Sequence, residues 1–141
     1  MESRHIYAFT AFQIVVAIGL IWFLITRSGP WNVRRYVGTV LILAGLTMIG
    51  VARYQLGRSF SVKAEAHQLV TTGLYSKIRN PIYVFGMVMI TGMILILGRP
   101  EGFLVLVAAV VAQTVRARRE AQVLEAAFGD AYREYRRKTW F

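Results

Sequence analysis

The chain has 141 residues, no cysteine and a formal net charge of +10, and 56% of its residues are hydrophobic. A soluble domain is usually about 45–50% apolar, so this composition favours a membrane protein of a single domain, residues 1–141. The absence of cysteine excludes disulfides, thiol catalysis and thiolate metal sites. Because the basic residues avoid the apolar runs, we expect them to face an anionic membrane surface and expect no nucleic-acid partner.

Four apolar stretches predict four transmembrane helices, and hence an all-α integral membrane protein. The first, residues 6–26, can cross a hydrocarbon core of about 30 Å at about 1.5 Å per residue. Because no small-residue cleavage site follows the N-terminus, we expect this stretch to be a retained span and not a cleaved signal peptide. The second covers 37–52. The third and fourth, 82–98 and 102–115, are joined by the turn sequence RPEG and should form an antiparallel hairpin.

A polar interface segment, residues 53–81, lies between the second and third spans. It ends at Asn80 and Pro81, which predict a helix start: Asn is a favoured N-cap whose side chain can accept a backbone N–H, and Pro suits the first helical position. Gly73 permits backbone conformations that other residues resist. A helix start, a glycine turn and the neighbouring Arg79 together suit a ligand that carries negative charge.

The fourth helix has no stop signal after Val115. Its pattern continues to Gly129, a good C-cap residue, so we expect it to project from the membrane with a charged end. Residues 116–141 then form a second interface segment with a basic, aromatic tail.

The basic residues also predict the orientation of the chain. With four spans, the two termini and the segment 53–81 share one face, and all but four of the 17 basic residues lie there. The exceptions are Arg27, Arg34, Arg35 and Arg99. By the positive-inside rule, a multi-pass protein with cytoplasmic N- and C-termini is predicted.

None of the seven acidic residues falls inside an apolar core. This weakens a proton-coupled transporter, which usually carries an ionisable residue in the membrane, and favours a site at the cytoplasmic interface. The sequence has no G-x-G-x-x-G after a strand, no P-loop and no H-E-x-x-H motif. His5 and His67 are too few for a metal site, so none is predicted.

Two separated blocks resemble one enzyme family. HQLVTTGLYSKIRNPIYVFG, His67 to Gly86, is similar to a signature of isoprenylcysteine carboxyl methyltransferases and their phospholipid methyltransferase relatives, roughly H-x-L-V-x-x-G-x-Y-x-x-x-R-H-P-x-Y-x-G. EAQVLEAAFGDAYREY resembles the family's E-E-x-x-L-x-x-x-F-G-x-x-Y-x-x-Y, and LGRSFSV a third, weaker block. The match covers about Leu56 to Tyr135, and the joint spacing of the blocks makes it specific.

The resemblance implies an integral membrane methyltransferase that uses S-adenosyl-L-methionine and acts on a lipid-borne or amphipathic acceptor, of the isoprenylcysteine carboxylate or phospholipid amine type. It implies catalytic roles for Arg79 and Glu120. By position in the motifs, the cofactor would be bound by His67, Leu69, Val70, Gly73, Tyr75, Arg79, Asn80, Pro81, Tyr83, Gly86 and Glu120.

Two positions depart from the family pattern. Asn80 stands where the family usually has His, and Ala121 where it usually has a second Glu, which excludes a mechanism that needs an imidazole at position 80. Taken singly, Asn80 is explained as a helix cap and Glu120 as a solvated partner of Arg116 at i−4. The functional interpretation rests on the joint spacing.

Two other classes of function stay open from the sequence. One is a sterol-reductase-like membrane enzyme that uses NADPH, because those reductases resemble this family in their C-terminal part. The other is a non-enzymatic membrane scaffold or a small transporter. Neither the methyl acceptor nor the oligomeric state follows from the residues.

Overall fold

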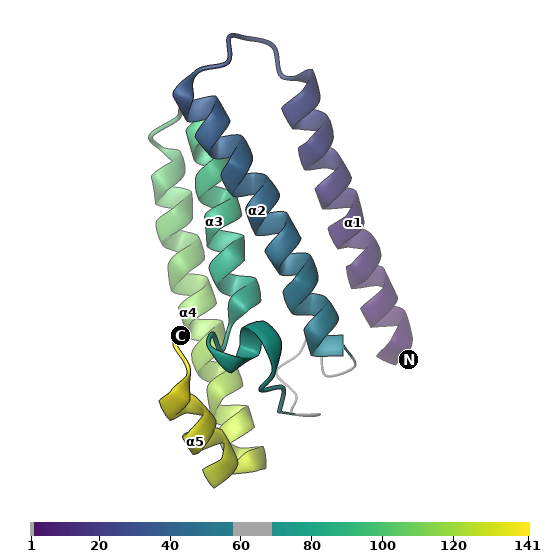
Figure 1. Ribbon diagram of the computed structural model, residues 1–141, viewed down its shortest axis with the longest axis vertical. Coiled ribbons are helices and arrows are strands. Elements are labelled where there is room, and N and C mark those ends of the chain that lie inside the picture. Colours follow the sequence, from purple (N-terminus) through teal and green to yellow (C-terminus); the bar gives the residue numbers. More distant parts are fainter. Residues whose placement is uncertain (1, 58–68) are drawn as a thin grey trace.

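The computed structural model describes residues 2–57 and 69–141, with side chains from residue 11 onward. Figure 1 shows a bundle of long helices with a short helix folded back at one end. The elements are α1 (Glu2–Thr26), α2 (Val33–Leu56), the 3-10 turn η2 (Gly73–Ser76), α3 (Pro81–Leu97), α4 (Gly102–Phe128) and α5 (Asp130–Lys138). The predicted all-helical class is confirmed for these residues, in which the only extended pairing is an isolated bridge.

Helix α2 is longer at both ends than the predicted 37–52. It begins at Val33 because the Asn32 side chain accepts the Arg35 N–H at 3.0 Å, a cap that the sequence analysis missed. It ends at Leu56, so the first residues of the predicted polar segment are helical. Among the described residues, α2 is the one helix that is clearly long and apolar enough to cross a bilayer, and the described apolar stretches Ala11–Thr26 of α1 and Pro81–Leu97 of α3 are shorter.

Arg35 fixes the connection between α1 and α2. Its guanidinium donates to the main-chain oxygens of Gly29 at 2.7 Å and Arg27 at 2.6 Å, and it lies 4.2 Å from the ring centre of Trp31. The side chain is buried, but these carbonyls beyond the end of α1 satisfy its donors. From the sequence, Arg35 was noted only as one of the four basic residues outside the predicted cytoplasmic face.

The closest helix pair is α2 and α3. A Cβ atom on Gly38 would meet the main-chain oxygen of Gly92 at 2.6 Å, and one on Gly45 would meet that of Phe85 at 2.9 Å. The two backbones can approach so closely only because these positions carry no side chain. Next to this crossing, Ile42 and Ile96 form a buried cluster with Leu24 of α1.

Helices α3 and α4 form the expected antiparallel hairpin. Gly98 ends α3 in the left-handed conformation, with φ of +62°, and α4 begins four residues later. Helix α4 then runs past Val115 to Phe128, and Gly129 ends it at φ of +52°, as predicted. Helix α5 folds back along the end of α4 and returns the chain towards the start of α3 (Figure 1).

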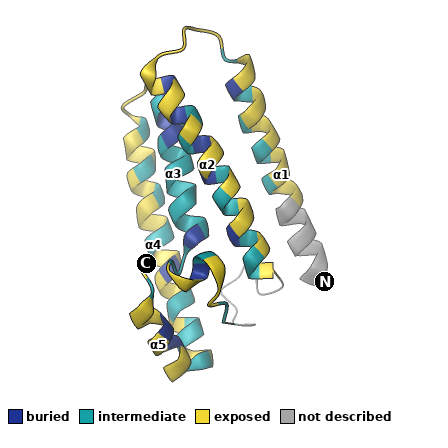
Figure 2. Cartoon of the chain, in the orientation of Figure 1, coloured by how far each residue is buried: buried dark blue, intermediate teal, exposed yellow. Residues whose placement is uncertain are grey.

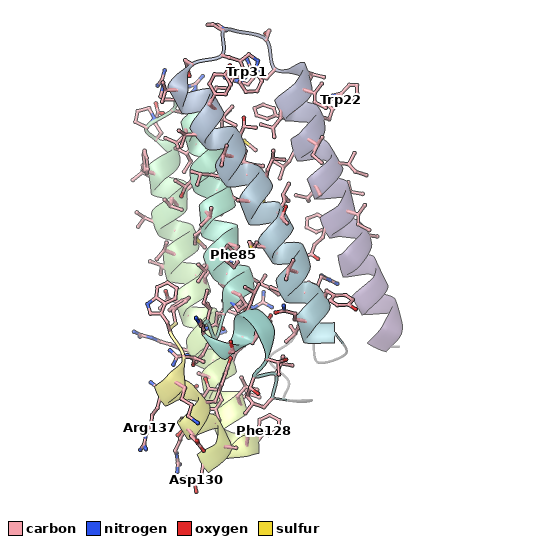
Figure 3. All side chains as sticks on the ribbon, in the orientation of Figure 1. Trp22, Trp31, Phe85, Phe128, Asp130 and Arg137 are labelled. Carbon is pink, nitrogen blue, oxygen red and sulfur yellow. The ribbon has the colours of Figure 1, made fainter. Side chains whose placement is uncertain are left out.

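Figure 2 shows that α3 is the most covered helix, whereas the coloured part of α1, from residue 11 onward, and the first half of α4 expose much of their surface. Those exposed positions are mostly large and apolar, such as Ile18 and Trp22 in α1 and Leu104 in α4. In Figure 3, Trp22 and Trp31 lie at one end of the bundle and Asp130 and Arg137 at the other. The bundle therefore has an aromatic end and a charged end, and the residues of both sequence blocks gather at the charged one.

Candidate functional site at the start of α3

The start of α3 is built by Asn80 and Pro81. Pro81 occupies the first turn and is fully buried, and the main-chain oxygen of Asn80 accepts the N–H groups of Tyr83 and Val84, both at 3.1 Å. Asn80 is thus the N-cap residue, as predicted. Its side chain, however, makes no cap hydrogen bond, because the backbone oxygen carries the cap contacts instead.

The segment after α5 pairs with the residues just before α3. The N–H of Trp140 donates to the oxygen of Lys77 at 2.7 Å, and the N–H of Arg79 donates to the oxygen of Trp140 at 2.9 Å. The N–H of Asn80 donates in the same way to the main-chain oxygen of Phe141 at 2.9 Å. These bonds form a short parallel pairing centred on Ile78 and Trp140.

Arg79 reinforces this pairing through its side chain. Its guanidinium donates to the main-chain oxygen of Arg136 at 3.0 Å and lies 3.4 Å from that of Thr139. Lone carbonyls at the end of a helix are good acceptors for such a cation. Among the described residues, no hydrogen bond joins Arg79 to Glu120, so the two expected catalytic side chains are not directly paired.

The turn η2 is clamped between α2 and α5. Gly73 opens it at φ of +60°, the kind of conformation that the sequence suggested for this glycine. The Gln55 side chain accepts the N–H of Leu74 at 2.7 Å, and the hydroxyl of Tyr135 donates to the oxygen of buried Tyr75 at 2.7 Å. Both contacts hold the first sequence block against distant helices.

Tyr83 and Glu120 join the two sequence blocks. The Tyr83 hydroxyl of α3 donates to Oε1 of Glu120 of α4 at 2.5 Å. Arg116, one turn earlier on α4, donates from Nε to the same oxygen at 3.2 Å, and its guanidinium lies 5.7 Å from the centre of the Tyr83 ring. The predicted pairing of Glu120 with Arg116 is confirmed, and Tyr83 is a second partner.

An apolar groove of about 460 Å³ begins beside this pair. Tyr83 belongs to its wall, together with residues of α2, α3, α4 and the C-terminal segment: Leu41, Val84, Met87, Val88, Thr91, Val110, Gln113, Thr114, Trp140 and Phe141. Its size and apolar lining are typical of a ligand pocket with a few placed polar groups. The Tyr83 side chain therefore connects a polar centre to an apolar groove.

The tyrosine hydroxyls outside the helices α1 to α4 stay protonated at neutral pH. Burial raises the pKa of Tyr75 and Tyr132, and it raises the pKa of Tyr135 to about 12. Of these, the Tyr135 hydroxyl donates a hydrogen bond to the main-chain oxygen of Tyr75.

For the remaining predicted site residues, the structure gives the location and burial of some and does not describe others. Leu69 and Val70 are half-buried in irregular backbone before η2, and Gly86 lies half-buried inside α3. His67 and most of the block LGRSFSV lie outside the described residues. Within the described part of the chain, no cluster of acidic or histidine side chains suits a metal ion.

The sequence model of the phospholipid methyltransferase family matches residues 33–131, which is more than half of the chain. The chain belongs to the phospholipid methyltransferase family. The resemblance found in the sequence is thereby confirmed, and the matched range runs from the start of α2 into α5. Phospholipid methyltransferase family members are membrane-associated methyltransferases that act on lipids. Comparisons with curated proteins and with solved structures gave no match.

Several residues of the site were not identified from the sequence as contacts. Gln55 was assigned to the polar segment because the second span was predicted to end at residue 52, whereas it lies in the last turn of α2. The pairing of Trp140 with Lys77 joins segments 63 positions apart. Tyr135 stands in the second motif, and its hydrogen bond to Tyr75 joins that motif to the first one.

Proposed function

We propose that the chain is an S-adenosyl-L-methionine-dependent methyltransferase that acts on a lipid-borne acceptor at the membrane interface. The observation that carries this proposal is the hydrogen bond to Glu120 from Tyr83, a residue that lines the apolar groove. A polar centre that adjoins an apolar groove suits one polar cofactor and one amphipathic acceptor. Membership of the phospholipid methyltransferase family supports the reaction class.

The side chains at this centre fit the cofactor chemically. S-adenosyl-L-methionine carries an ammonium and a carboxylate, and Glu120 and Arg116 offer the two complementary charges side by side. Tyr83 adds an aromatic ring whose centre lies 5.7 Å from the Arg116 guanidinium, and Tyr75 is a motif position that offers a second ring. We propose that these residues bind the cofactor together with the motif positions His67, Leu69, Val70, Gly73, Arg79, Asn80, Pro81 and Gly86.

When bound, the cofactor supplies a methyl group activated by a positively charged sulfur. The transfer is a direct displacement, so the protein contributes mainly alignment and exclusion of water. The groove holds the acceptor chain and keeps water away from the reacting atoms. A carboxylate acceptor needs no base. An amine acceptor must lose a proton before it attacks, and Glu120 is the nearby group that can accept this proton.

The proposed membrane arrangement has four spans, formed by α1, α2, α3 and the first part of α4. The large apolar side chains exposed on α1 and α4 support it, because a lipid environment would cover them. The N- and C-termini would be cytoplasmic. A reporter fused after Phe141 should then report the cytoplasm and one inserted at Pro100 the opposite side; finding both on one side would contradict the proposed hairpin orientation.

The function is tested by calorimetry on the detergent-solubilised protein with S-adenosyl-L-methionine and, separately, with NADPH. We expect binding of the first and none of the second. The Tyr83→Phe variant should bind the cofactor more weakly, because it loses the hydroxyl that holds Glu120. Binding of NADPH alone would favour the sterol-reductase-like alternative, and binding of neither would favour a scaffold or transporter. A screen of lipid acceptors with labelled methyl donor then tests turnover.

A further inference from the structure

Gln113 is an amide side chain in the wall of the apolar groove. It lies on α4 within the stretch FLVLVAAVVAQTV, and its side chain is half-buried. Among the residues that the structure describes, Gln113 has no hydrogen-bond partner. Its neighbour Thr114 also lines the groove, but the Thr114 hydroxyl donates to the oxygen of Val110 at 2.8 Å and is satisfied within its own helix.

An unpartnered amide in apolar surroundings costs free energy. Membrane helices usually use such a side chain to bond a neighbouring helix. Gln113 does not do this with any helix described here, so packing gives no reason for its polarity. A ligand in the groove can supply the missing partner.

The position of Gln113 on α4 fixes how far from Glu120 that hydrogen-bond partner must lie. Gln113 and Glu120 are seven residues apart on α4, which is two turns, so both project from nearly the same face and lie about 10 Å apart along the axis. Tyr83 links the two places, since it lines the groove and bonds Glu120. One amphipathic molecule can therefore reach Gln113 while its head group lies at Glu120.

We propose that Gln113 is a specificity-determining residue that donates a hydrogen bond to a linkage carbonyl of the lipid acceptor. This rests on the proposed function, and it narrows the acceptor to lipids with a carbonyl about 10 Å from the methyl-accepting atom. In an extended glycerophospholipid amine, bonds of about 1.5 Å place the ester carbonyls at about this distance from the nitrogen. Beyond its thioether, a prenylcysteine offers only hydrocarbon there.

The experiment compares a diacyl phosphatidylethanolamine with its dialkyl ether analogue, which has the same head group and chain length but no carbonyl. Methyl transfer and lipid binding are measured in parallel for the wild-type chain, Gln113→Leu and Gln122→Leu. Gln122 is the matched control, because it is exposed on the same helix outside the groove. We expect the wild type and Gln122→Leu to prefer the ester lipid about five- to tenfold, the range for one hydrogen bond.

Gln113→Leu should lose this preference while its thermal stability stays equal or rises, since a purely structural glutamine would lower stability without changing the ratio. An equal response of the wild type to both lipids, or a preference that survives in Gln113→Leu, would overturn the proposal. Ester-selective binding that depends on Gln113 without methylation of either lipid would support the assignment of Gln113 and reject the proposed function.

Discussion

The hydroxyl of Tyr135, the last residue of the second motif, donates a 2.7 Å hydrogen bond to the main-chain oxygen of Tyr75, in the turn within the first motif. Both side chains are buried. Tyr135→Phe removes the donor and leaves a buried carbonyl unpaired, so we expect a loss of about 1–3 kcal/mol in the free energy of unfolding. Thermal denaturation in detergent measures it. Tyr54→Phe is the control, because Tyr54 is 88% exposed, and equal losses in both variants would show that the buried bond contributes nothing.

Alkaline pH should weaken the same contact. Burial raises the pKa of Tyr135 from an ordinary 10.0 to about 12, so its contribution to stability is complete below about pH 10 and is lost as the pH rises through about 12. Burial shifts the pKa of Tyr75 and Tyr132 in the same direction. Melting temperatures between pH 8 and 12 should fall less steeply for Tyr135→Phe than for the wild type. Parallel curves would exclude Tyr135 as a titrating group.

Glu120→Gln tests the polar centre with little change in size. It removes the charge that Tyr83 and Arg116 contact, and we expect at least a tenfold loss of cofactor affinity or turnover, about 1.4 kcal/mol. Glu125→Gln is the matched control on the same helix. Glu125 pairs with Arg133 at 2.9 Å on an exposed surface, where one ion pair contributes little. If calorimetry and turnover assays find both variants like the wild type, Glu120 has no role in binding or transfer.

Arg79→Ala tests how the tail is held. Because the Arg79 guanidinium contacts the oxygens of Arg136 and Thr139, its loss should let the segment after α5 detach more often. Charge-assisted hydrogen bonds contribute about 1.5–3 kcal/mol, so tryptic cleavage within α5 should speed up at least tenfold. Lys77→Ala should cleave at the wild-type rate, since Lys77 contacts Trp140 only through its backbone. Cofactor affinity, measured on both variants, reports whether Arg79 also acts in the site.

Gly38→Ala tests the crossing of α2 and α3. The added methyl group would meet the Gly92 oxygen at 2.6 Å, so the helices must separate, at a cost of about 1–3 kcal/mol. Gly50→Ala, in the same helix, has no atom within 4 Å of the added methyl group and should stabilise the helix by about 0.5–1 kcal/mol. Chemical unfolding of the two variants should therefore give changes of opposite sign. Two stabilised variants would mean that the close approach of α2 and α3 is not needed.

Much of the fold followed from local patterns in the sequence. The hairpin of α3 and α4, the continuation of α4 past Val115 and its end at Gly129 all depend on residues a few positions apart, and all were predicted correctly. The predicted bounds of the second helix, 37–52, were too narrow, and a different effect extends each end of α2. Asn32 caps the helix just inside a segment that resembled a loop, and polar residues up to Leu56 continue a helix already formed.

Some contacts among the candidate site residues could be predicted from the sequence, and others could not. Motif spacing placed Tyr83 and Glu120 in the same site, and the structure brings them to 2.5 Å. The motif spacing did not indicate that the Arg79 side chain would bind the tail. That contact joins residues 57 positions apart through a backbone oxygen, which every residue has. Side-chain identity carries no signal for such partners.

The pairing of Trp140 with Lys77 and Arg79 also determines how late in synthesis this part of the fold can form. In the proposed four-span arrangement, the helices can enter the bilayer one after another as the ribosome makes them, since each satisfies its own backbone. The residues that precede α3 cannot, because their hydrogen-bond partners are translated more than 60 residues later. This pairing can therefore form only after residues 140 and 141 have been synthesised, so the part of the groove wall made by Trp140 and Phe141 is completed last.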